Sequence, residues 1–189
     1  LQNKVIDKSK IRMIRGAGVD TTEYTPAKQI EGVPLVVLPA RMLWDKGVGD
    51  FVECAKQLTK LGAKFRFALV GDPDPCNPNS ISEDQLKHWV SEGVVEWWGR
   101  CEDMPSVYKQ TSIVCFPSTY GEGLPKALLE AASSSIPIVT YDVSGCREIV
   151  IDGKNGFLVP PKDISALTNS INVLLNDGDM RKRFGNYGR

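Results

Sequence analysis

Two carboxylates, Glu122 and Glu130, are separated by seven residues at a junction that suits anion binding. An apolar run at residues 112–116 precedes the junction and residues 127–134 have helical composition, so the predicted order is strand, glycine-bearing loop and helix. The start of a helix presents free backbone N–H groups and the positive end of the helix dipole. An ionised carboxylate, in contrast, only accepts hydrogen bonds. The combination therefore suits a ligand that carries both phosphate groups and vicinal hydroxyl groups.

Two cations, Arg41 and Lys46, follow a second apolar run at residues 35–38. In an open sheet the carboxyl ends of parallel strands meet at one edge, so we expect both side chains to face the helix start near Lys126. Arginine binds phosphate oxygens in a bidentate manner, and lysine acts as a point charge. Such a pair would add to an anion site at that edge of the sheet. In isolation, the same two residues would be interpreted as ordinary surface charges.

Strands and helices alternate from Pro34 onward. This alternation predicts an α/β domain with a doubly wound, mostly parallel, six-stranded Rossmann-like sheet. The strands are expected at residues 35–38, 65–70, 94–98, 113–116, 136–141 and 156–159. The helices are expected at residues 50–61, 82–92 and 104–110, from near Lys126 to Ser134, and at 146–149 and 164–175. We expect the last of them to end at Asp177-Gly178 and to be the final helix.

The segment from Pro117 to Ala131 resembles the donor site of retaining glycosyltransferases of the GT-B fold, family four. A pair of glutamates at this spacing is by itself a short pattern with a high false-positive risk, and Glu130 alone would be interpreted as a solvated helix residue. The flanking residues strengthen the match. They are Pro117-Ser118, Glu130-Ala131, Pro137-Ile138-Val139, Gly145, Glu148-Ile149-Val150, Asp152-Gly153 and Asn155-Gly156. The resemblance covers residues 16–188, and Arg41 with Lys46-Gly47 resembles the family's diphosphate clamp.

The resemblance implies a hexosyltransferase-type enzyme that takes a sugar from a nucleotide diphosphate, most often UDP, with retention at the anomeric carbon. Glu122, Arg41 and Lys46 are the candidate catalytic residues, with Glu122 on the donor sugar and the two cations on the diphosphate. Glu130 would accept hydrogen bonds from the ribose. The remaining candidate donor-binding residues are Gly123, Leu124, Lys126 and Ala127, through their backbone N–H groups, and Arg100 and Met104 at the base. For Arg100 and Met104, an ordinary loop role is an equally good interpretation.

The same resemblance implies an incomplete enzyme. Residues 1–20 would be the tail of a missing N-terminal domain and a linker, and residues 21–189 would be the nucleotide-sugar-binding domain. Because the acceptor site would belong to the missing domain, we expect this chain to bind the donor weakly and to transfer nothing by itself. A sugar-nucleotide epimerase or a phosphorylase of the same architecture, and a noncatalytic nucleotide-sugar-binding module, are the alternatives.

Composition limits the partners and the compartment. Lys plus Arg and Asp plus Glu number 23 each, so no overall charge attracts nucleic acid. Five widely spaced cysteines favour a reduced, cytoplasmic protein, and no apolar run approaches the ~20 residues of a membrane-spanning helix. Arg181-Lys182-Arg183 leaves peripheral contact with the inner face of a membrane as an alternative, although three charges on a helix are more often solvated.

No metal or other cofactor is expected. Asp72-Pro73-Asp74 offers too few converging carboxylates for an oxygen-liganded metal, and the sole histidine, His88, is expected on the surface of a helix.

One residue departs from the family pattern near the site. Ser135 stands where these enzymes more often carry glycine, which costs little only if its backbone keeps a negative φ.

Overall fold

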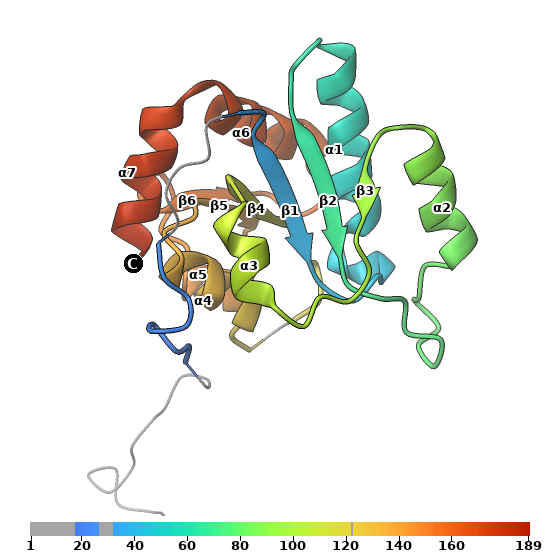
Figure 1. Ribbon diagram of the computed structural model, residues 1–189, viewed down its shortest axis with the longest axis horizontal. Coiled ribbons are helices and arrows are strands. Elements are labelled where there is room, and N and C mark those ends of the chain that lie inside the picture. Colours follow the sequence, from blue (N-terminus) through green and yellow to red (C-terminus); the bar gives the residue numbers. More distant parts are fainter. Residues whose placement is uncertain (1–17, 27–31, 122) are drawn as a thin grey trace, which may run out of the picture.

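A six-stranded parallel sheet, in the order β3-β2-β1-β4-β5-β6, forms the centre of the computed structural model, which describes residues 18–26, 32–121 and 123–189. All five strand pairs are parallel, and Figure 1 shows helices on both faces of the sheet. The predicted doubly wound α/β fold is therefore confirmed. The strands are β1 (Leu35–Pro39), β2 (Arg66–Val70), β3 (Glu96–Trp97), β4 (Ile113–Phe116), β5 (Ile138–Tyr141) and β6 (Gly156–Val159).

The sheet is covered on one face by α1 (Val48–Lys60), α2 (Glu83–Ser91) and α6 (Ile164–Asn176), and on the other by α3 (Met104–Lys109), α4 (Lys126–Ser133) and α5 (Ser144–Arg147). Alternate strand residues enter the two layers, because successive side chains on a strand point to opposite faces. Val36 packs with α1 and α6, whereas Val37 packs against α3. No helix in the described part of the chain is long and apolar enough to cross a membrane.

The edge strand β3 is shorter than expected. Only Glu96 and Trp97 pair with β2, whereas the sequence predicts a strand over residues 94–98. An edge strand has one neighbour, so its apolar residues can pack without continuing the ladder. Val95 is buried, and the Trp97 indole N–H donates a hydrogen bond to the Gly71 carbonyl at 2.9 Å. His88 is exposed on α2, as predicted.

The prediction that the chain's last helix ends at Asp177-Gly178 is half wrong. Helix α6 does end there, but a further helix, α7 (Gly178–Gly188), begins at once. Asp177 caps it, because the aspartate side chain accepts a hydrogen bond from Met180 N at 2.7 Å. Phe184 anchors α7 in the core. An Asp-Gly pair indicates the end of a helix, but its aspartate is also a favourable N-cap for a helix that follows.

Ser135 does not keep a negative φ. Its φ is +56°, in the left-handed region that a residue with a Cβ adopts at a cost, so the condition for a cheap replacement of glycine is not met. The reason lies in the connection from α4 to β5. Ser135 N donates to Ala132 O at 3.0 Å and Ile136 N donates to Ala131 O at 3.0 Å, which closes the helix end in a tight turn.

We expect Ser135→Gly to raise the free energy of unfolding by roughly 0.5–1 kcal/mol. Glycine adopts the left-handed conformation without steric strain, and the greater entropy of the unfolded glycine chain offsets only part of this gain. Urea unfolding followed by circular dichroism measures the change. Ser135→Ala is the matched control, since alanine keeps a Cβ, and it should bring no gain. Equal stability of the glycine variant and the natural chain would show that the turn holds no strain.

Candidate functional site

A cleft of 290 Å³ opens at the carboxyl ends of β1 and β4. Four residues that the sequence proposes for the site lie together on its wall: Arg41, Lys46, Lys126 and Ala127. The other lining residues are Pro39, Ala40, Phe116 and Pro125. The cleft lies between two adjacent parallel strands whose connections leave in opposite directions along the sheet, which is the usual place for a ligand in a fold of this kind.

Lys46 is the buried cation of the cleft, with only 9% of its surface exposed. It ends a single 3-10 turn, η2 (Trp44–Lys46), and its ammonium nitrogen lies 5.1 Å from the Tyr120 ring centroid and 6.0 Å from that of Phe116. Burial is the main cause that lowers the pKa of Lys46, and the nearby Arg41 charge acts in the same direction. An anionic ligand beside it would therefore favour its charged form.

The Lys46 turn is locked against the loop that follows β4. Gly47 has a φ of +76°, and a Cβ on it would lie 2.0 Å from the Pro117 carbonyl oxygen. Thr119 N donates a hydrogen bond to the Asp45 carbonyl at 3.0 Å. Only a glycine allows this approach of two backbones. The contact places Lys46 across the cleft from the start of α4.

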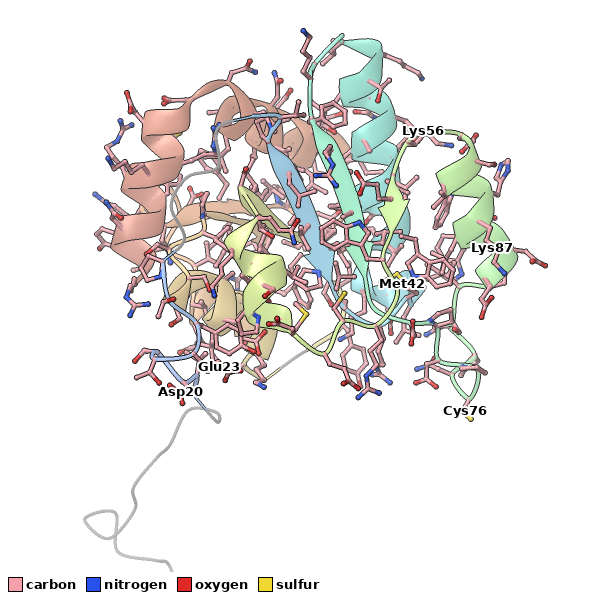
Figure 2. All side chains as sticks on the ribbon, in the orientation of Figure 1. Asp20, Glu23, Met42, Lys56, Cys76 and Lys87 are labelled. Carbon is pink, nitrogen blue, oxygen red and sulfur yellow. The ribbon has the colours of Figure 1, made fainter. Side chains whose placement is uncertain are left out.

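Arg41 lies at the mouth of the cleft, with 60% of its side chain exposed. Its Nη1 atom lies 2.7 Å from the Asp74 carboxylate, which belongs to the loop between β2 and α2; Figure 2 shows Cys76 at the far end of that loop. An exposed ion pair contributes little to stability, so a phosphate can compete with Asp74 for the guanidinium. The sequence did not indicate this pair, because its partners are far apart along the chain.

The two aspartates of Asp72-Pro73-Asp74 each have a protein partner. Asp74 pairs with Arg41, and Asp72 accepts a hydrogen bond from Arg100 N at 2.9 Å. In the described ranges, no group of three or more His, Cys, Asp and Glu residues lies where it could hold a metal ion. These contacts do not test the expectation that no metal is needed, which stays a prediction.

The start of α4 forms the second wall. Pro125 stands at the N-cap and its side chain provides no capping hydrogen bond to the first turn, so the amides of Lys126 and Ala127 begin the helix beside the cleft. The Lys126 side chain is 72% exposed and adds a third cation. Gly123 and Leu124, the other two proposed amide donors, do not line the cleft. Glu122 lies outside the described residues.

Glu130 is not a solvated helix residue, since only 6% of its surface is exposed. One carboxylate oxygen, Oε2, accepts a hydrogen bond from the Tyr108 hydroxyl at 3.0 Å, and the other, Oε1, lies 3.3 Å from the Lys126 ammonium. Burying an ionised carboxylate is costly unless it is paired or serves a ligand. Tyr108, which sequence reasoning missed, has an ordinary helical position in α3, and only the tertiary fold reveals its contact.

Arg100 and Met104 do not line the cleft. Arg100 is exposed in the loop after β3 and is tied to Asp72 through its backbone N–H. Met104 is half-buried and packs against two of the core clusters from the start of α3. Their proposed contact with a base stays a prediction.

Comparisons with known proteins show which protein family the chain matches. The family model of the glycosyl transferases group 1 matches residues 20–189. The chain is 30% identical to the N,N'-diacetylbacillosaminyl-diphospho-undecaprenol alpha-1,3-N-acetylgalactosaminyltransferase of Campylobacter jejuni, over 96% of this chain and 49% of that protein. The chain thus spans about half the length of this curated relative.

Two solved structures show the same fold. The C-terminal domain of a glycosyl transferase group 1 family protein, LpcC of Francisella tularensis, aligns with a TM-score of 0.72 and 26% identity, over 90% of this chain and 94% of that one. HepE of Anabaena in complex with UDP aligns with a TM-score of 0.79 and 22% identity, over 90% of this chain and 50% of that one. At 22% identity, the likeness to HepE shows a shared fold only.

Proposed function

Because the chain belongs to the glycosyl transferases group 1 family and corresponds to the C-terminal domain of a GT-B glycosyltransferase, we propose that it binds a UDP-linked sugar as the donor for retaining transfer. The observation that carries this proposal is one cleft with cations on both walls and a buried carboxylate behind it. The phosphate groups would bind to the cations and to the amides at the helix start, and the ribose hydroxyls would donate hydrogen bonds to the carboxylate.

In the proposed reaction the bond between the anomeric carbon and the diphosphate breaks, and the acceptor oxygen bonds to that carbon on the same face. The departing diphosphate gains negative charge and takes the acceptor's proton. Lys46 and Arg41, with the first amides of α4, would stabilise that charge, which is the largest demand of the step. Glu122 remains our candidate for the sugar hydroxyls.

Full-length relatives are about twice as long, so we propose that transfer needs a further domain that supplies the acceptor. The division of the chain at residue 20 and the predicted cytoplasmic location, with or without contact with a membrane, stay predictions.

A thermal-shift screen against UDP-, GDP- and ADP-sugars tests the donor, because a ligand that binds only the native state raises the melting temperature. We expect the UDP-sugars to produce the largest shift. Lys46→Met should then lower the affinity for UDP roughly 10- to 100-fold, the value of a hydrogen bond to a charged group. Isothermal titration calorimetry measures it.

Lys182→Met is the matched control, since Lys182 is exposed on α7, and it should bind UDP like the natural chain. Unchanged binding by the Lys46 variant would remove the diphosphate role. If no nucleotide sugar shifts the melting temperature at millimolar concentration, donor binding by this chain is rejected.

A further inference from the structure

The ammonium group of Lys46 lies over the faces of two aromatic rings. The centroid of the buried Phe116 ring is 6.0 Å from the ammonium nitrogen, and that of the Tyr120 ring is 5.1 Å away. The face of an aromatic ring carries negative charge and attracts a cation at such distances. Lys46 and Phe116 line the cleft, whereas Tyr120 does not and is 57% exposed. Tyr120 therefore contacts the buried cation of the cleft from outside the lining.

Hydrogen bonds join the loop that carries Tyr120 to the turn that carries Lys46. The Asp45 carbonyl oxygen accepts from Thr119 N at 3.0 Å, from Ser118 Oγ at 3.3 Å and from Thr119 Oγ1 at 3.4 Å. Tyr120 N in turn donates to Ser118 Oγ at 3.3 Å. Asp45 precedes Lys46 and Thr119 precedes Tyr120, so these bonds fix the backbones on both sides of the contact. The ring and the ammonium are thus held next to each other by their own loops.

A ring suits a lysine that has to bind an anionic ligand. The ammonium of lysine ends a flexible four-carbon stem, so its position depends on what it contacts. A carboxylate partner would compete with a phosphate for the charge, whereas a ring attracts the cation and leaves its charge in place. Burial is the largest cause that lowers the pKa of Lys46, and the charge of Asp45 acts in the opposite direction. The ring also favours the charged form, since it attracts only a cation.

We propose that Tyr120 is a positioning residue of the donor site, whose ring face holds the Lys46 ammonium where it meets the diphosphate of the nucleotide. The inference rests on the proposed function, because it presumes that a nucleoside diphosphate occupies the cleft. The role belongs to the ring and not to the hydroxyl, since the ammonium lies over the ring. Phenylalanine can therefore replace Tyr120 in this role, whereas leucine, which fills a similar volume without a π system, cannot.

The test measures UDP affinity by isothermal titration calorimetry. Tyr120→Leu should lower the affinity about five-fold, the value of a partly exposed cation–π contact. Tyr120→Phe should bind UDP like the natural chain. Tyr187→Leu is the matched control, because Tyr187 on α7 is also 57% exposed, and it should leave the affinity unchanged. Circular dichroism checks that each variant is folded, as expected for exposed positions.

A double-mutant cycle distinguishes action through Lys46 from every other role of the ring. In a Lys46→Met background the cation is gone, so Tyr120→Leu should cause no further loss of UDP affinity. A ring that only supports the loop, or that stacks directly on the ligand, would still be missed in that background. An additive loss would therefore overturn the proposal.

The remaining outcomes separate this inference from the proposed function. If the natural chain does not bind UDP, the proposed function fails and the inference fails with it. If UDP binds and Lys46→Met binds it equally well, the diphosphate role of Lys46 is lost together with the inference. If Lys46→Met weakens binding and Tyr120→Leu does not, only the inference is overturned. Equal losses for Tyr120→Phe and Tyr120→Leu would assign the effect to the hydroxyl and would also overturn it.

Discussion

Replacing Gly47 with alanine is expected to lower the free energy of unfolding by roughly 3 kcal/mol or more. Two causes add. The backbone there has a φ of +76°, and the new Cβ would lie 2.0 Å from the Pro117 carbonyl oxygen, far inside contact distance. A backbone atom cannot rotate away as a side chain can, so the Lys46 turn and the Pro117 loop must move apart.

Gly62→Ala separates the two causes. Gly62 has nearly the same φ, +72°, but nothing lies within 4 Å of the position that a Cβ would take, so this control carries the conformational cost alone, about 1 kcal/mol. Urea unfolding of both variants measures the difference. Equal losses would show that the two loops around Gly47 do not approach each other so closely. Where Gly47→Ala remains folded, calorimetry should show weaker UDP binding, whereas Gly62→Ala should bind normally.

The position of the cleft could be predicted from the sequence because it follows from topology. Arg41 and Lys46 come after β1, and Lys126 comes after β4. In a parallel sheet such segments emerge at the same edge, and β1 and β4 are neighbours. Short-range signals served equally well for helix starts, since Ser82 caps α2 by accepting from Gln85 N at 3.2 Å.

Contacts between distant residues could not be predicted. The Arg41–Asp74 pair joins residues 33 positions apart, and the Tyr108–Glu130 hydrogen bond joins residues 22 positions apart. Neither pair has a sequence pattern of its own, because each depends on how loops and helices pack after the sheet has formed. The left-handed backbone of Ser135 is a similar case. It results from the exit of α4 toward β5, where the local sequence Ser-Ser-Ser carries no signal for a positive φ.

Glu130→Ala is expected to lower the affinity for UDP roughly 10- to 100-fold, since hydrogen bonds to an ionised carboxylate contribute about 1.5–3 kcal/mol. The variant should also lower the free energy of unfolding by roughly 1 kcal/mol, because the buried Tyr108 hydroxyl loses one acceptor but keeps the Ala127 carbonyl oxygen at 3.1 Å. Calorimetry with UDP measures the first change and urea unfolding the second.

Glu83→Ala, at an exposed glutamate that pairs with Lys87 on α2, controls for the loss of a negative charge far from the cleft and should bind UDP normally. If Glu130 binds the ribose, the loss of affinity must depend on the ribose hydroxyls. Affinity for 2′,3′-dideoxy-UDP should fall much less than affinity for UDP, since that nucleotide cannot use the carboxylate. Unchanged UDP affinity would reject the role outright. In that case the buried carboxylate would serve only to join α3 to α4, and the cations of the cleft would have to bind the donor without it.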